Sequence, residues 1–150
     1  MQEEAWARLQ FALEHRHPLT LLVGPAGTGK SLLLRRILSE QKLRGSKGAL
    51  LSLQGMTRTS LLWFALAELG LNPPRDATEI SLLRQWKDSV RAWQLQGKKG
   101  LLLLDDFQTA TSELFSLLPA LIPVDDPENP LTVVLAADSG ALSRIPNWWL

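Results

Sequence analysis

The stretch that decides the fold reads Gly24-Pro25-Ala26-Gly27-Thr28-Gly29-Lys30-Ser31. It matches the pattern G-x-x-x-x-G-K-[ST] at every fixed position. The apolar run Leu19–Val23 precedes it, as a buried strand would, and leucines at helical spacing follow it. Glycines let the backbone turn tightly and approach an anion without a Cβ in the way. Successive N–H groups at the start of the helix then face that anion. The stretch therefore predicts a phosphate-binding loop between a strand and a helix.

Each part of this Walker A pattern has a predicted chemical role. The Lys30 ammonium would reach the β- and γ-phosphates of a nucleoside triphosphate, and the Ser31 hydroxyl would ligate Mg²⁺. The other reading is a Gly-rich turn that arose by chance. The predicted nucleotide-binding residues are consecutive in the chain: Gly24, Pro25, Ala26, Gly27, Thr28, Gly29, Lys30, Ser31 and Leu32.

A second motif is the run Leu101-Leu102-Leu103-Leu104-Asp105-Asp106. Four apolar residues that end in an acid indicate a strand that delivers a carboxylate to the edge of a sheet, as in a Walker B strand. There Asp105 would hold Mg²⁺ opposite Ser31, and Asp106 would orient and polarise an attacking water as a catalytic residue beside Lys30. The alternative for Asp106 is a solvated loop acid.

Two further polar positions have weaker predicted roles. Asp138 and Ser139 follow an apolar strand, so either side chain could sense the γ-phosphate, and either could instead cap the next helix. Arg144 is the one cation among residues 101–150. It fits an arginine-finger role less well than that of a solvated surface residue.

Apolar spacing along the rest of the chain alternates between strand and helix patterns. Asp76-Ala77-Thr78-Glu79 has capping-box spacing with Asp76 as the cap. The strands are expected at residues 19–23, 49–53, 101–104 and 131–136, and the helices at about 3–15, 30–44, 60–69, 77–96 and 114–121. This alternation predicts an α/β domain with three layers, in which helices cover both faces of a parallel sheet.

Aromatic and basic residues outside the motifs leave alternatives open. Trp86 and Trp93 lie seven apart on one helical face and are predicted to be core, as are Trp6 and Trp63. Five cations could form a nucleic-acid-binding face, although a solvated helix face is the simpler reading: Arg35, Arg36, Lys42, Arg44 and Lys47. His15 and His17 precede the first strand, near where a nucleotide base could lie, and no metal is predicted there.

Composition excludes several classes of protein. The 150 residues carry a formal net charge of +1 with 45% hydrophobic and 21% charged residues, which is ordinary for a globular domain. Absence of cysteine excludes thiolate metal sites, a cysteine nucleophile and disulfides. No apolar run approaches the ~20 residues that cross a bilayer. We expect one cytoplasmic domain over residues 1–150, without membrane insertion.

The residues also resemble a known family. The segments Glu4–Leu9 and Leu13–His17, followed by the loop Gly24–Ser31, look like the opening of AAA+ ATPases related to general secretion pathway protein A, which are similar to ATPases that serve transposition. The resemblance implies a strand order of 5-1-4-3-2, bound ATP and Mg²⁺, assembly into homo-oligomers, and DNA as a candidate partner. The chain departs from the family where Asp106 replaces the usual Glu. Since it ends at Leu150, soon after the fourth strand, we expect the fifth strand and the helical lid to be missing and the domain to be incomplete.

Together these patterns favour an ATP-binding module that hydrolyses ATP with Mg²⁺ and so controls a partner protein or an assembly. The first alternative is a nucleotide-binding module that does not hydrolyse ATP, because Asp106 is one methylene shorter than Glu. A P-loop kinase for a small molecule is the weaker alternative.

Overall fold

The computed structural model describes residues 2–15, 17–24, 29–123 and 125–138. Strands and helices alternate along this part of the chain, as the sequence predicts. In chain order the elements are α1 (Gln2–Glu14), β1 (Leu19–Val23), α2 (Lys30–Leu43), β2 (Lys47–Ser52), α3 (Arg58–Glu68), α4 (Glu79–Gln96), β3 (Gly100–Asp105), the 3₁₀ helix η1 (Phe107–Thr109), α5 (Ser112–Leu121) and β4 (Leu131–Ala137). Pro25–Thr28, Ser139 and Arg144, all singled out from the sequence, lie outside the described residues.

The four strands of the described chain form one parallel sheet in the order β1-β4-β3-β2. This agrees with the 1-4-3-2 part of the expected order. Strands β3 and β4 occupy the centre, and nearly every residue in them is buried. Because the strands are parallel, their carboxyl ends meet at one edge of the sheet. Gly24 after β1, and Asp105 and Asp106 at the end of β3, therefore share that edge.

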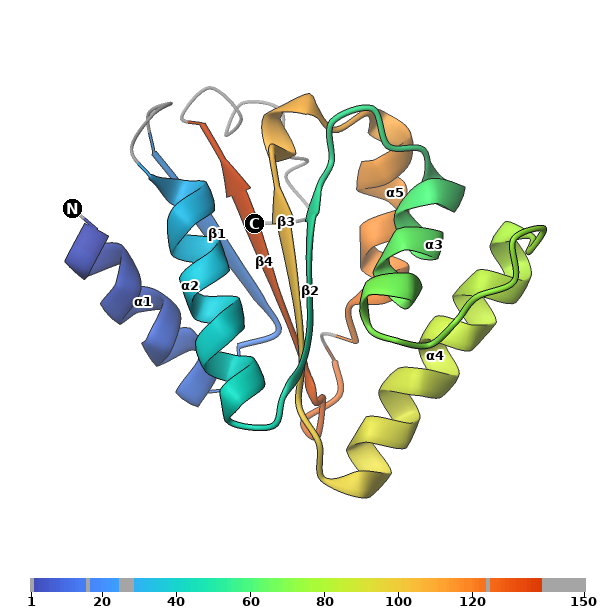
Figure 1. Cartoon of the computed structure of the whole chain (residues 1–150), viewed down its shortest axis with the longest axis horizontal. Helices are drawn as coiled ribbons and strands as arrows, with labels where there is room; N and C mark the ends of the chain where they lie inside the picture. Colours follow the sequence, from blue (N-terminus) through green and yellow to red (C-terminus); the bar gives the residue numbers. More distant parts are fainter. Residues whose placement is uncertain (1, 16, 25–28, 124, 139–150) are drawn as a thin grey trace.

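Helices cover both faces of the sheet (Figure 1). Helices α1 and α2 lie on one face, where Leu9, Leu34 and Ile37 pack against alternate residues of β3 and β4. Helices α3, α4 and α5 lie on the other face over a larger apolar cluster. Burial of both faces explains why the central strands read as continuous apolar runs rather than alternating ones.

The tryptophans divide between the core and the rim. Trp86 and Trp93 are buried as predicted, with their rings edge to face at 6.5 Å, and the Trp86 indole N–H donates to the Leu121 carbonyl at 3.1 Å. Trp63 and Trp6 are half-buried and pack against the two apolar clusters, so their predicted place in the core is confirmed only in part. Trp63 donates its indole N–H to a loop carbonyl, and the Arg36 guanidinium covers the ring of Trp6 at 4.1 Å.

The start of α4 differs from the prediction. Thr78, not Asp76, is the cap residue, and its side chain accepts a hydrogen bond from the Ser81 N–H at 3.2 Å. Asp76 lies in a turn two residues earlier. A cap side chain must reach the second or third N–H of the helix, and Thr78 stands three residues before Ser81. The helix therefore begins at Glu79 with a threonine cap.

Strand β2 begins two residues earlier than its apolar run suggests. The Lys47 N–H donates to the Lys99 carbonyl at 2.9 Å, and Gly48 is buried beside Leu38. Neither Lys47 nor Gly48 has the large apolar side chain that indicates a buried strand. They join β2 because they pair with Gly100 and Leu101 of β3. The strand ends at Ser52, and this position matters for the site.

Candidate functional site

The stretch Gly24–Ser31, which the sequence predicts to bind phosphate, joins β1 to α2 at the carboxyl edge of the sheet. The Gly24 N–H donates to the Ala137 carbonyl at 3.3 Å, which ties the start of the stretch to the end of β4. Gly29 has φ +82°, in the left-handed region, directly before α2 begins at Lys30. The Lys30 ammonium donates to the Gly24 carbonyl at 2.7 Å, so the side chain folds back across the stretch. This places a cation beside the start of a helix, where an anion is favoured.

Ser31 and Asp105 meet at this edge. Ser31 lies in the first turn of α2 and Asp105 ends β3, and the serine Oγ donates to Asp105 Oδ2 at 2.5 Å. The other carboxylate oxygen, Oδ1, accepts the Asp106 N–H at 2.8 Å. A hydroxyl and a carboxylate side by side are the hard oxygen donors that Mg²⁺ takes, completed by water and phosphate oxygens. The donor set fits the predicted metal.

Asp106 has an unusual backbone and a partner that sequence reasoning missed. Its φ of 56° and ψ of 38° are left-handed, and it caps the 3₁₀ helix η1. Its Oδ2 accepts a hydrogen bond from the Ser52 Oγ at 2.6 Å. Ser52 ends β2 and pairs with Asp105 in the register of the sheet. Only the pairing of β2 with β3 could have identified Ser52, because a single serine after an apolar run does not by itself indicate a functional residue.

The proposed sensor region is represented by Asp138 alone. Its backbone N–H donates to the Gln108 side-chain carbonyl at 3.3 Å, which joins the end of β4 to η1. Gln108 is a second residue that the sequence did not indicate. This hydrogen bond involves the backbone of Asp138, and the sensor role of its side chain stays a prediction.

A cleft of about 290 Å³ is lined in part by Gly24, Gly29 and Lys30. It lies between α1, β1 and the start of α2, and most of its lining is apolar. The lining residues are Glu4, Ala5, Arg8, Leu9, Thr20, Leu21, Leu22, Val23, Gly24, Gly29, Lys30 and Leu33. The Thr20 Oγ1 is buried and has no hydrogen-bond partner among the described residues. Leu32, predicted to bind nucleotide, is not in this lining and is 65% exposed on α2.

The two histidines lie outside this cleft. The His15 ring stacks on Phe11 with centroids 3.8 Å apart, and its Nδ1 lies 2.9 Å from the Phe11 carbonyl. His17 approaches the same phenylalanine edge-on at 5.9 Å. The described residues contain no group of three or more His, Asp or Glu side chains placed to hold a metal.

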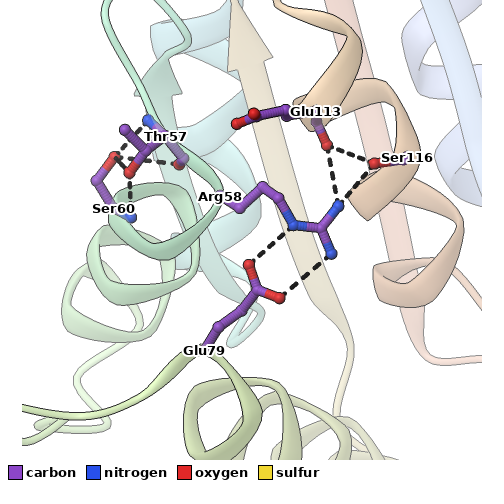
Figure 2. A network of polar contacts seen from close by, with 6 residues as sticks. All are labelled: Thr57, Arg58, Ser60, Glu79, Glu113 and Ser116. Carbon is purple, nitrogen blue, oxygen red and sulfur yellow. Dashed lines mark hydrogen bonds and ion pairs between the residues drawn. The ribbon is translucent and has the colours of Figure 1, made fainter.

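A network of polar contacts around Arg58 joins α3, α4 and α5 (Figure 2). Arg58, at the start of α3, makes a bidentate pair with Glu79 of α4, with Nε and Nη2 at 2.8 and 3.3 Å from the two oxygens. Its Nη1 donates to the Glu113 carbonyl at 3.1 Å and to Ser116 Oγ at 2.6 Å, both on α5. The hydrogen bond from Arg58 lowers the pKa of Glu79 against the opposing effect of burial, and the same bond raises the pKa of Arg58. Arg58 thus ties three helices together.

Comparison with known proteins finds one matching family model and several solved structures with a similar fold. The model described as "AAA domain" matches residues 13–145. Cdc6p from Pyrobaculum aerophilum has a TM-score of 0.75 at 18% identity, over 97% of this chain and 41% of that one. ORC2 from Aeropyrum pernix, in ADPNP–ADP complexes, has a TM-score of 0.65 at 22% identity, over 94% of this chain and 42% of that one. AMPPCP-bound DnaA from Aquifex aeolicus has a TM-score of 0.59 at 21% identity, over 98% of this chain and 42% of that one.

These likenesses show the fold, and the chain spans about two-fifths of the length of the three solved proteins. No curated protein matches the sequence. Among the described residues, no helix is long and apolar enough to cross a membrane.

Proposed function

The chain belongs to the AAA domain family, and from this premise we propose that it is an ATP-binding module that hydrolyses ATP with Mg²⁺ and so controls a partner protein or an assembly. Its fold is that of the AAA+ P-loop ATPases. The observation that carries the proposal is the 2.5 Å hydrogen bond between Ser31 and Asp105 beside the phosphate-binding stretch. A chance Gly-rich turn would have no reason to place its serine against the acid of a central strand.

The triphosphate would bind along the stretch Gly24–Ser31. Lys30 supplies a positive charge there, and the N-terminus of α2 adds the positive end of the helix dipole. Ser31 and Asp105 would hold Mg²⁺, which supplies further positive charge to the phosphate oxygens. The base would occupy the apolar cleft between α1 and β1, which reaches Gly29 and Lys30. The solved ORC2 and DnaA proteins, which carry ADPNP, ADP or AMPPCP, support a nucleotide of this kind.

Asp106 would orient the water that attacks the γ-phosphate. Ser52 holds Oδ2 of this carboxylate at 2.6 Å, so Oδ1 is the oxygen that would accept the hydrogen bond from water. Catalysis by the chain would then consist mainly of positioning and charge neutralisation, as is typical of phosphoryl transfer. The left-handed backbone at Asp106 supports this role, since such conformations cluster at functional sites.

A second candidate is a nucleotide-binding module without hydrolysis. Two observations favour it: the short Asp106 side chain, and its engagement by Ser52. The test is release of inorganic phosphate from ATP and Mg²⁺ by the wild type and by Asp106→Asn. Turnover above background that disappears in Asp106→Asn supports the ATPase. Tight ATP binding with no turnover in either protein supports the second candidate.

Some functions of longer relatives come to this chain only as proposals. We propose that the chain associates with itself into a ring and that it contacts DNA. We also propose that it belongs with the ATPases related to general secretion pathway protein A, which are similar to the transposition ATPases. Phosphate release measured against protein concentration, with and without duplex DNA, tests self-association and contact with DNA. A rate per molecule that rises with concentration indicates that one subunit completes the site of another.

A further inference from the structure

The edge of the sheet opposite the nucleotide site carries a cluster of cations on two adjacent turns. One turn joins α2 to β2 and the other joins α4 to β3. The Lys47 N–H donates to the Lys99 carbonyl at 2.9 Å, so the two turns lie side by side. Their exposed residues, here called the basal surface, are Lys42, Leu43, Arg44, Lys47, Leu95, Lys98 and Lys99.

Most of this charge is uncompensated. Arg44 pairs with Glu40 at 3.0 Å on the same helix. The four lysines make no ion pair or side-chain hydrogen bond with any residue in the described ranges. Crowding of like charges on two tight turns opposes folding slightly, because the lysines repel one another. An anionic partner would relieve that repulsion.

The basal surface is not uniformly polar. Leu43 is 90% exposed and Leu95 is 76% exposed. Leu43 lies four residues before Lys47, which begins β2, and Leu95 lies four residues before Lys99, which directly precedes β3. Both leucines are the most exposed large apolar residues of the described chain. A leucine in water at the end of a helix contributes nothing to the core, but it can bury apolar area against a partner.

A small cleft of about 140 Å³ lies between the two turns, the end of α1 and the segment before β4. Its lining combines Arg44, Lys98 and Lys99 with the amide side chains of Gln41 and Gln94. Two carboxylates, Glu14 and Glu128, also line it. The cleft therefore offers hydrogen-bond donors of two kinds within a volume suited to one or two side chains.

We propose that the basal surface docks an acidic segment of a partner protein in which carboxylate side chains alternate with apolar ones. The carboxylates would lie against the lysines, and the apolar side chains would contact Leu43 and Leu95. A nucleic-acid backbone fits less well, because it has no apolar side chains for the leucines. The structure thus favours the protein segment by its mixture of charge and apolar surface.

Fluorescence anisotropy of the whole chain with a labelled peptide tests this docking. The probe is a short peptide in which Glu, Asp, Leu and Gly alternate. We expect binding at low salt that weakens as ionic strength rises. Charge reversal on either turn, Lys98→Glu with Lys99→Glu or Lys42→Glu with Lys47→Glu, should weaken binding at least tenfold. Leu43→Ser with Leu95→Ser should weaken it severalfold.

The matched control is Arg84→Glu with Lys87→Glu, which makes the same change of charge at exposed positions nearer the start of α4. It should bind the peptide within twofold of the wild type, and so should Lys30→Ala, whose site lies at the other edge. Three results would overturn the proposal: no binding at low salt, an equal loss in the control variant, or equal affinity for oligoglutamate. Tighter binding of duplex DNA with the same dependence on the basal lysines would assign the surface to nucleic acid instead.

Discussion

Ser31 and Asp105 are 74 positions apart in the chain, and yet the serine Oγ donates to the aspartate Oδ2 at 2.5 Å. The topology makes this contact, because α2 starts at the same edge of the sheet where β3 ends. The bond unites the two motifs that the sequence contains separately.

The first prediction concerns the metal. Ser31→Ala and Asp105→Asn should each weaken ATP binding in Mg²⁺ by about tenfold or more, since the first removes a proposed oxygen ligand and the second removes the negative charge of one. Without Mg²⁺, affinity of these variants should match the wild type within about threefold, because the phosphate contacts of Lys30 remain. Titration with a fluorescent ATP analogue, with Mg²⁺ or with EDTA, measures both. Ser39→Ala, an exposed serine on the same helix, is the control. Equal losses with and without Mg²⁺ would contradict the role.

Ser52 provides a second prediction, on turnover. Ser52→Ala removes the hydrogen bond that fixes the Asp106 carboxylate, so kcat for ATP should fall about threefold to tenfold while KM stays within about twofold. Ser52→Thr keeps the hydroxyl and should keep most of the rate. Steady-state phosphate release gives both parameters. A higher kcat in Ser52→Ala would mean that the serine restrains Asp106 rather than positions it.

Much of the fold could be predicted from the sequence, because its signals are local and strong. The apolar runs of β3 and β4 and the pattern from Gly24 to Ser31 need no tertiary information. Residues that depend on pairing across the sheet were missed. Ser52 gains its meaning only from lying beside Asp105 in the register, and the first two residues of β2 join the strand because β3 pairs with them. Trp6 and Trp63 show a further limit, since spacing finds the buried side of a helix but not where its layer ends.

The Arg58 network predicts a dependence of stability on pH. Glu79 has its pKa lowered by the hydrogen bond from Arg58, so its contribution to stability is present above the ordinary value of 4.5 and is lost as pH falls through the folded-state pKa. Glu79→Gln should therefore lose stability at neutral pH, by about 0.5–1 kcal/mol after allowance for solvent screening, and show a shallower loss on acidification. Urea unfolding at neutral and acidic pH measures this.

The control for that experiment is Glu68→Gln, an exposed carboxylate on α3. Its stability should follow pH as the wild type does. If Glu79→Gln and the wild type lose stability in parallel on acidification, the ion pair is not the cause.

Replacing two buried glycines by alanine should destabilise the fold by different amounts. A Cβ at Gly100 would meet the ring of Trp93 at 2.5 Å, and one at Gly48 would meet the tip of Leu38 at 2.5 Å. Trp93 is 4% exposed and packs edge to face with Trp86, so it has little room to move. Leu38 is half-buried and can change rotamer. Gly100→Ala should cost about 1–3 kcal/mol and Gly48→Ala less. Thermal unfolding compares them, and equal costs would contradict the packing argument.

The central claim is that the stretch Gly24–Ser31 binds a nucleoside triphosphate, and calorimetric titration of the chain with ATP and Mg²⁺ tests it most directly. The wild type and Lys87→Ala, an exposed lysine on α4, should bind one ATP per chain with the same affinity. Lys30→Ala should bind at least about tenfold more weakly, because it removes the charge closest to the phosphates. Equal binding by Lys30→Ala and the wild type, or no binding by either, would contradict the account.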